Sequence, residues 1–271
     1  MTRLSDYDTS RTSAALVKES HRITSKDTPE VRSILLSVSH PDFSYREGQN
    51  IGITVPGAQA FGHEQHFRLY TIANTPRQTE GGDIEIELCV RRCFYIDEVS
   101  GEEYPGLASN FLCDARPGDR IAFTGPYGDA FRIPEDPATN LLMIGTGTGI
   151  APFRAFIQHI YEKQPDWQGQ VRLFYGARTG TETLYRNDLN DDLSNYYDRD
   201  TFEAFEGLSQ RPWMDREDTG LSEVLENNAA AIWELMQDSK THVYIAGLPK
   251  TAEDFYRAMT GEAGSTARWR W

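Results

Sequence analysis

The residues with the clearest chemical potential are three glycines at alternate positions, Gly145, Gly147 and Gly149. They follow an apolar run, 141–144, that is typical of a buried parallel strand, and they precede a helical pattern with Pro152 in its first turn. A strand, a glycine turn and a helix N-terminus can hold a pyrophosphate, because glycines let the backbone come close and free N–H groups meet the negative charge. A plain tight turn would give the same spacing, so the rest of the chain has to decide.

A second set of candidate residues lies in the alternating segment 67–72. Arg68 and Tyr70 are two positions apart, so a strand places both on one face, whereas Thr71 points to the other face except at a strand end or a bend. The arginine fork can neutralise a diphosphate, and the tyrosine ring can stack on a flat aromatic ligand. An ordinary exposed strand face is the alternative interpretation.

Length and composition limit the classes of protein that fit. A chain of 271 residues suits two domains, and 11% aromatic residues with regular apolar runs argue against disorder, although the hydrophobic fraction is only 39%. The net charge of −14 disfavours nucleic acid and anionic membranes as partners. No stretch is apolar enough to span a membrane or to form the core of a secretory signal, so we expect no membrane insertion.

The cysteines indicate the redox environment. Cys89, Cys93 and Cys113 are odd in number and lack the spacing of zinc or iron–sulfur ligands, so we expect no metal site. Reduced thiols in a cytoplasmic compartment fit this set better than disulfides do.

The first half of the chain is predicted to be antiparallel β-structure. Its alternating segments, separated by Gly and Pro, are 31–38, 51–55, 67–72, 84–90 and 120–124. Several short strands of this kind imply a barrel or a sandwich. The polar residues 1–13 are expected to form a flexible tail.

After about residue 136 the period of the pattern changes. Strands are predicted at 141–144, 171–175, 201–205 and 242–246, and helices near 153–163, 183–193, 221–237 and 250–259. This alternation predicts a parallel α/β sheet. With the boundary near 134–137, the expected domains are 14–135 and 136–271.

Seven short segments in register carry a family resemblance. They are residues 45–49, 68–71, 89–92, 109–113, 117–119, 124–126 and 145–152. In this order the chain resembles the plant-type ferredoxin–NADP reductase family, from about residue 15 to about residue 250. The resemblance implies an antiparallel six-stranded FAD-binding barrel followed by a parallel doubly wound domain that binds the pyridine nucleotide, with hydride passing between nicotinamide and flavin.

The resemblance also implies roles around FAD. Arg68 would hold the pyrophosphate, Tyr70 would stack on the flavin, and Thr71 would replace the family's serine near flavin N5. Tyr95 would stack on the adenine, with an ordinary surface aromatic as the competing interpretation. Arg91 matches a basic residue directed at the nucleotide phosphates, and a solvated charge is its alternative.

Ser109 begins a helix-like stretch and is a good N-cap, and a pyrophosphate could occupy the same N-terminus. The resemblance favours both roles at once. The remaining positions expected around the flavin are Leu69, Cys89, Val90, Leu107, Ala108 and Thr148.

The nucleotide side follows from the same comparison. Residues 145–148 would line the NADP(H) pyrophosphate, and Ser209 with Arg211 would meet the 2′-phosphate, which needs positive charge and hydroxyls. The other positions are Gly145, Thr146, Gly147, Gly176, Ala177, Arg178, Gly247 and Leu248. The family's downstream lysine and tyrosine have no counterpart near 218–221, so NADPH is favoured over NADH without excluding it.

Two departures bear on the chemistry. Ala246 stands where the family has a cysteine beside the nicotinamide, which would slow hydride transfer or alter nicotinamide positioning. The chain ends on Trp271, and a terminal aromatic that covers the exposed flavin face is a family feature, with a frayed end as the alternative.

We therefore predict an FAD-dependent reductase that passes electrons between NADPH and a separate one-electron carrier, ferredoxin or flavodoxin. The reductase component of an oxygenase, using NADPH or NADH, is the closest alternative. A flavin-binding regulatory module that has lost hydride transfer is the alternative from another class. The sequence leaves the carrier, the direction of electron flow and the oligomeric state open.

Overall fold

The computed structural model describes residues 7–56, 65–96, 101–129, 131–185, 193–212, 214 and 218–263. The chain divides into two compact units, Met1–Arg132 and Ile133–Trp271, and each is described by itself. Within the described residues, no helix combines the length and apolarity needed to cross a membrane.

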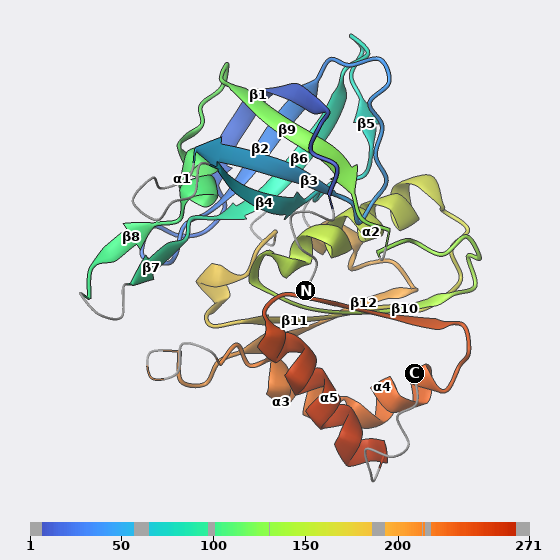
Figure 1. Ribbon diagram of the computed structural model, residues 1–271. Coiled ribbons are helices and arrows are strands. Elements are labelled where there is room, and N and C mark those ends of the chain that lie inside the picture. The colour runs from blue at the N-terminus through green and yellow to red at the C-terminus, as the bar shows by residue number, and fades with distance from the viewer. Residues whose placement is uncertain are drawn as a thin grey trace. The chain divides into compact units, whose positions relative to one another are not determined.

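The first unit is an antiparallel β-barrel (Figure 1). Its six long strands are β1 (Thr12–Arg22), β2 (Val31–Val38), β3 (Asn50–Pro56), β4 (Gln65–Thr71), β6 (Ile84–Arg91) and β9 (Arg120–Tyr127). They follow the order β4-β3-β9-β1-β2-β6, with the short β5 (Arg77–Gln78) beside β6. A bridge between Ile72 and Leu88 closes the ring between β4 and β6. The predicted six-stranded barrel is confirmed.

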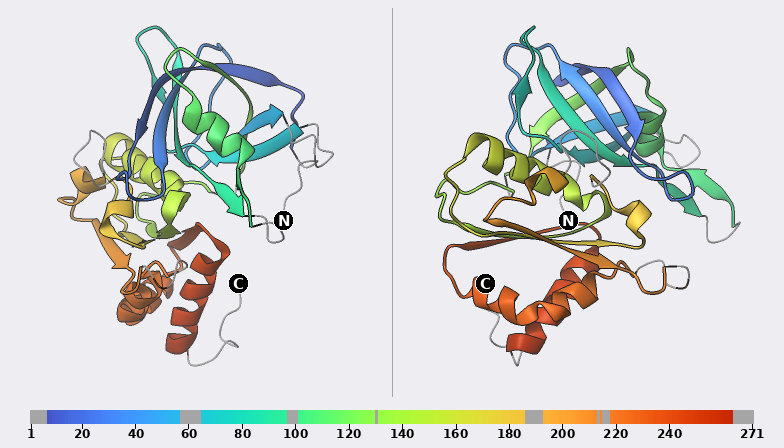
Figure 2. Two further views of the ribbon diagram at one scale, coloured as in Figure 1. Left: turned by 90° about the vertical axis from the view of Figure 1, so that its left-hand side faces the viewer. Right: turned by 180° about the vertical axis from the view of Figure 1, so that it is seen from behind.

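Alternation of apolar side chains builds the barrel core. Ile51 and Ile53 of β3 are fully buried. So are the alternate residues Ile34 and Leu36 of β2 and Ile86 and Leu88 of β6. Helix α1 (Leu107–Asp114) lies at one end of the barrel and adds Leu112 to the same core (Figure 2). The hairpin of β7 (Phe94–Ile96) and β8 (Glu103–Pro105) projects from the barrel.

Strand β1 was not foreseen. It begins at Thr12, inside the segment 1–13 that we expected to be a tail, and Thr12 pairs with Thr124 of β9. Outside residues 14–17 its sequence is polar, and its register against β2 shifts between Val17 and Glu19. A shift of this kind breaks the two-residue period by which a strand is recognised in a sequence.

The second unit is a parallel doubly wound sheet, as predicted. Its strands β10 (Asn140–Thr146), β11 (Val171–Ala177), β12 (Phe202–Leu208) and β13 (Thr241–Ala246) follow the order β12-β11-β10-β13. Helix α2 (Ile150–Lys163) covers one face, and α3 (Leu221–Asn227), α4 (Ala229–Met236) and α5 (Pro249–Ala263) cover the other (Figure 1).

Two helix predictions for this unit need correction. The helix near 183–193 is wrong over its first residues, because Thr183 has an extended backbone and Tyr185 has a positive φ of 58°; residues 186–192 lie outside the described part. The helix 221–237 is two helices, since Asn228 (φ −113°, ψ 11°) leaves the helical region and its side-chain amide donates to the Val224 carbonyl at 2.8 Å.

Candidate functional site

Strand β4 presents two of the predicted flavin residues on one face. Arg68 and Tyr70 lie opposite Ile53 and Ile51 of β3, so the expectation that they share a face holds in this register. Arg68 is exposed, and its Nη1 donates to the Phe67 carbonyl at 2.8 Å. Within the described part of the chain the rest of its guanidinium has no partner, which leaves an arginine fork available to an anion.

Tyr70 is half-buried against the barrel core. Burial raises the pKa of its hydroxyl above the usual value, and the neighbouring thiols of Cys93 and Cys113 act in the same direction. The phenol therefore stays neutral, and its ring packs against the barrel core. An uncharged aromatic ring suits stacking on a flat apolar ring system.

Thr71 ends β4, and its hydroxyl donates to Asn50 Oδ1 at 2.6 Å. Its proton is therefore committed to β3. Its remaining capacity in this structure is as a hydrogen-bond acceptor.

The N-terminus of α1 corrects one expectation. Gly106, not Ser109, is the N-cap, and no described side chain bonds the first-turn N–H groups there. Ser109 is the third residue of the helix; its Oγ donates to the Gly106 carbonyl and accepts from the Cys93 N–H, each at 3.2 Å. A Cβ at position 106 would lie 3.0 Å from that Oγ and 3.1 Å from the Cys93 carbonyl, so a larger residue there would have to push these neighbours away. The first-turn N–H groups are therefore open to an anion such as a phosphate.

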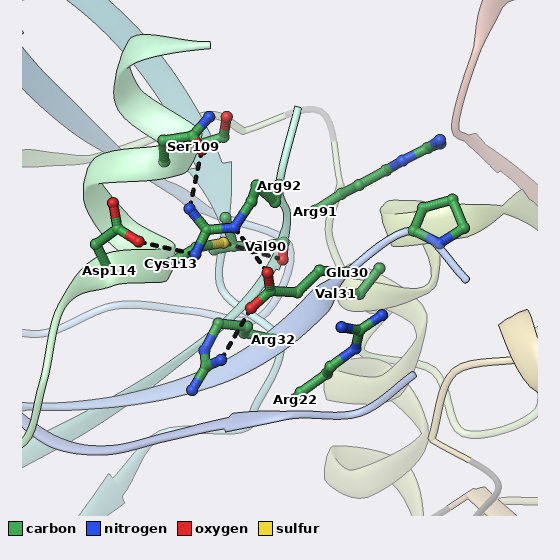
Figure 3. A network of polar contacts seen from close by, with 12 residues as sticks. Arg22, Glu30, Val31, Arg32, Val90, Arg91, Arg92, Ser109, Cys113 and Asp114 are labelled. Atoms are coloured by element: carbon green, nitrogen blue, oxygen red, sulfur yellow. Dashed lines mark hydrogen bonds and ion pairs between the residues drawn. The ribbon is translucent and has the colours of Figure 1, made fainter. Parts of the chain in front are cut away.

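An ion-pair network that the sequence did not indicate fixes this helix to the barrel (Figure 3). Arg92 donates from Nε to Glu30 at 2.7 Å, from Nη1 to Asn110 at 2.9 Å and from Nη2 to Asp114 at 2.8 Å. Arg32 donates to the other oxygen of Glu30 at 2.9 Å. Arg92, directly after β6, thus connects Glu30, which precedes β2, with both turns of α1.

Electrostatics in the network are mutually supporting. Partial burial works to lower the pKa of Arg92, but Glu30 and Asp114 outweigh it and raise that pKa above its usual value. For Glu30, burial works to raise the pKa, and the two arginines lower it overall. Burial raises the pKa of the neighbouring Cys113 thiol to about 12, so this cysteine is a packing residue and not a thiolate nucleophile. Neighbouring residues of an extended chain point to opposite faces, so Arg91 and Arg92 had to differ in their surroundings. This alternation is the sequence signal that could have singled out Arg92.

The other predicted flavin positions divide into exposed and buried ones. Arg91 is exposed, and Tyr95 is 47% exposed on the projecting hairpin, where its ring stacks on Tyr104 with 5.3 Å between centroids. Leu69 and Leu107 are half-buried, and Cys89, Val90 and Ala108 are buried. The buried ones could offer a ligand their main chain.

In the second unit the glycine turn has two kinds of glycine. A Cβ on Gly145 would lie 2.9 Å from the Phe153 ring, and one on Gly149 would lie 2.3 Å from the Ala246 carbonyl, so both are glycines for internal packing. Gly147 has φ +54°, and no described atom would lie within 4 Å of its Cβ. It is the position at which a ligand could approach the backbone.

Hydrogen bonds fix this turn from two sides. The Tyr175 hydroxyl donates to the Gly147 carbonyl at 3.0 Å, and the hydroxyls of Thr146 and Thr251 are 2.8 Å apart. The Thr146 side chain is therefore directed toward α5. A Cβ on Gly247 would lie 2.5 Å from that same Thr146 hydroxyl, which explains this glycine as well.

The remaining predicted residues of this turn region are more open. Thr148 is half-buried in the short helix η3 (Gly147–Gly149), and Leu248 is 65% exposed after β13. Trp271 lies outside the described residues, and its role stays a prediction.

The carboxyl ends of β11 and β12 carry the candidates for the 2′-phosphate. Arg178, after the buried Ala177, forms a bidentate ion pair with Glu182 at 2.9 and 2.6 Å. A Cβ on Gly176 would lie 2.7 Å from both Thr219 Oγ1 and Leu221 Cβ. Gly176 is therefore required by packing against the start of α3.

Ser209 and Arg211 behave differently from each other. The Ser209 hydroxyl donates to Asp218 at 2.7 Å and accepts from the Arg211 backbone N–H at 3.1 Å. The Arg211 side chain is exposed, and its guanidinium has no hydrogen-bond or ion-pair partner among the described residues. Glu182 and Asp218, which hold Arg178 and Ser209, were not foreseen.

These groups fit the two cofactors that the resemblance implies. An available arginine fork, an uncapped helix N-terminus and a neutral tyrosine ring suit FAD in the first unit. In the second unit, the open Gly147 at the carboxyl end of β10 and the exposed Arg211 suit a phosphorylated nucleotide. Among the described residues, no group of three or more potential ligands could hold a metal ion.

Comparisons with known proteins agree with this division. The family model described as an oxidoreductase FAD-binding domain matches residues 15–131, and that described as an oxidoreductase NAD-binding domain matches residues 143–257. The ferredoxin–NADP reductase of Spirulina sp. is 34% identical over 243 residues, which are 88% of this chain and 81% of the relative. That of Thermosynechococcus vestitus is 35% identical over 245 residues, 89% of this chain and 63% of the relative.

Solved structures give the same fold. The H286L mutant of the ferredoxin–NADP+ reductase from Plasmodium falciparum has a TM-score of 0.73 at 19% identity, covering 97% of this chain and 94% of that one. This likeness concerns the fold alone.

The matched domains define an oxidoreductase that combines an FAD-binding with a nicotinamide-nucleotide-binding domain. The chain belongs to the ferredoxin–NADP reductase family, so the resemblance seen in the sequence is confirmed. The chain spans 63% of the length of the T. vestitus relative and 57% of the Synechocystis one.

Proposed function

We propose that this chain is an FAD-dependent reductase that passes electrons between NADPH and ferredoxin, or a flavodoxin-type carrier. The observation that supports the proposal is that each unit has groups open to an anion. They are Arg68 and the first turn of α1 in one unit, and in the other Gly147 and Arg211, whose guanidinium has no partner among the described residues. FAD, when bound, accepts a hydride and releases electrons singly, which suits a two-electron donor and a one-electron acceptor.

In the FAD-binding domain, which we assign to residues 14–135, Arg68 and the first turn of α1 hold the pyrophosphate, and Tyr70 covers the flavin ring. Thr71 accepts a hydrogen bond near the flavin, because its proton is already donated to Asn50. We assign Tyr95, whose ring stacks on Tyr104, to stack on the adenine.

In the nucleotide-binding domain, which we assign to residues 136–271, Gly147 lets the pyrophosphate reach the backbone at the start of α2. Arg211 meets the 2′-phosphate, and Leu248 and Gly247 border the nicotinamide side of the turn. Trp271 is assigned as the aromatic that covers the flavin; replacing it with Ser should tighten nucleotide binding, and an unchanged affinity would remove it from the site.

The carrier is a separate protein. The chain has three cysteines, and all are free thiols, so it cannot supply the four thiolates of an iron–sulfur cluster. Free thiols, one of them exposed at Cys93, also suit a reducing, cytoplasmic compartment. The relatives' names specify ferredoxin, and flavodoxin is the second carrier to test.

The test is anaerobic mixing of the purified, FAD-loaded protein with NADPH, followed by addition of oxidised ferredoxin. The flavin absorption band should bleach and then recover as ferredoxin is reduced. The Arg68→Ala protein, prepared without FAD, serves as the control for nucleotide-independent changes. A flavin band that stays unbleached would identify a binding module without hydride transfer.

A further inference from the structure

The carboxylate of Asp218 accepts a hydrogen bond from Ser209, the residue predicted to meet the 2′-phosphate. We propose that Asp218 is a specificity-determining residue that acts against the 2′-phosphate, so that the protein uses NADH as well as NADPH. The preference between the two nucleotides is then set by Arg211 on one side and Asp218 on the other. This inference rests on the proposed function, because it assumes that a nicotinamide nucleotide binds at the carboxyl ends of β11 and β12.

The Ser209 hydroxyl is the first step of the argument. Ser209 follows β12 and is 9% exposed; its Oγ donates to Asp218 Oδ2 at 2.7 Å, and it accepts from the Arg211 N–H at 3.1 Å. A hydroxyl has one proton, so Ser209 cannot donate to a phosphate while it donates to Asp218. A phosphate at Ser209 would therefore have to take this proton and would also stand next to a carboxylate of the same sign.

Asp218 is held in place by packing as well as by hydrogen bonds. Its Oδ1 accepts from the Gly220 N–H at 2.9 Å. Gly220 has φ +68°, and a Cβ there would lie 2.4 Å from the Leu208 nitrogen; a Cβ on Gly207 would lie 2.3 Å from the Gly220 carbonyl. The backbones of 218–220 and the end of β12 thus approach as closely as two glycines allow, so the carboxylate cannot swing away from Ser209 with its backbone.

The second cation of the region offers little compensation. Arg178 is committed to Glu182 through two hydrogen bonds, and both side chains are about one-fifth exposed. Of the two arginines that follow β11 and β12 in the described residues, Arg211 alone has a guanidinium without a partner. One exposed arginine with one fixed carboxylate nearby in the same loop region gives only modest discrimination between NADPH and NADH.

The experiment replaces Asp218 by Asn, which keeps an oxygen to cap Gly220 and removes the charge. Calorimetry on the FAD-loaded protein measures binding of 2′,5′-ADP and of 5′-AMP, and steady-state kinetics give kcat/KM for NADPH and NADH. We expect Asp218→Asn to tighten 2′,5′-ADP about tenfold, to leave 5′-AMP unchanged and to raise the NADPH-to-NADH ratio of kcat/KM about tenfold. Arg211→Ala should weaken 2′,5′-ADP alone.

Asp200→Asn is the matched control, because Asp200 is an exposed carboxylate that precedes β12 at the opposite edge of the sheet. Asp218→Ser, which also keeps a capping oxygen, replaces Asp218→Asn if that variant fails to fold. Equal changes for both nucleotides would identify a purely structural cap, and an unaltered ratio, or a wild-type protein that NADH does not reduce, would overturn the proposal. Failure of the proposed function is distinct, since it is an unbleached flavin with either nucleotide, whereas 2′,5′-ADP binding reports on Asp218 without flavin chemistry.

Discussion

The two units of the chain position their candidate ligand groups by different means. In the barrel unit, side-chain ion pairs do so: Arg92 ties α1 to Glu30, and Arg68 is left available for an anion. In the nucleotide unit, close backbone packing at glycines fixes the turns. Candidate ligand groups there already bond other side chains of the unit, as Arg178 does with Glu182. On the proposed function, the first unit would hold one anionic cofactor tightly and the second would bind a nucleotide that exchanges.

The largest expected effect is in the ion-pair network. Arg92→Ala should lower the free energy of unfolding of the barrel unit by about 2–4 kcal/mol, because Glu30 would lose its main partner while mostly buried. FAD should also dissociate sooner, since Asn110 and Asp114 no longer fix α1. Thermal unfolding followed by flavin fluorescence measures both effects.

Arg120→Ala, at an exposed arginine of β9, is the control for loss of one positive charge. Arg92→Lys should be intermediate, because it keeps the charge and loses the fork. A midpoint within experimental error of the wild type for Arg92→Ala would mean that α1 is held by its apolar contacts alone.

The second effect separates ligand binding from stability in the same unit. Arg68→Ala should weaken FAD binding by about ten- to a hundred-fold, since a charge-assisted hydrogen bond contributes roughly 1.5–3 kcal/mol. The FAD-free protein should unfold at the wild-type temperature, because among the described residues this guanidinium bonds only the neighbouring Phe67 carbonyl. Full retention of FAD after dialysis would refute the assignment of Arg68.

The division of the chain into a barrel unit and a nucleotide unit could be predicted from the sequence, because it follows from short-range patterns. Period-two alternation predicted five of the six long barrel strands, and the glycine turn was correctly placed between a parallel strand and a helix. Asp218 and Glu30 could not be found this way, because each acts on residues brought near by tertiary structure. The N-cap of α1 was misassigned because Ser109 is a favourable capping type, whereas close packing against Cys93 places Gly106 there.

The third effect tests the glycine packing of the nucleotide unit. Gly149→Ala should destabilise this unit by about 1–3 kcal/mol, because the new methyl group would lie against the backbone at Ala246. Gly147→Ala is the matched variant: its methyl meets open space, so the expected cost is only about 1 kcal/mol for a positive φ. Nucleotide affinity should instead fall in Gly147→Ala. Differential scanning calorimetry and 2′,5′-ADP titration distinguish them, and a reversed order of stabilities would contradict the assignment.

The smallest effect is the pH dependence contributed by Glu30. Its pKa in the folded protein lies below the ordinary value of 4.5, since Arg92 and Arg32 together outweigh the opposing effect of burial. A lowered pKa gives stability that is fully present above pH 4.5 and is lost as the pH falls through the folded-state value. Glu30→Gln should therefore cost about 1 kcal/mol at pH 7 and less as the pH falls below 4.5, so its stability should approach that of the wild type in acid.

The measurement is the denaturation midpoint of the FAD-loaded protein from pH 7 to pH 3.5, compared between wild type and variant so that other carboxylates cancel. Glu19→Gln, at an exposed carboxylate of β1, is the control and should run parallel to the wild type. If Glu30→Gln also runs parallel, the ion pairs around Arg92 carry no net stability. The barrel unit would then hold α1 as the nucleotide unit holds its turns, by packing, and the contrast between the two units would be limited to Arg68.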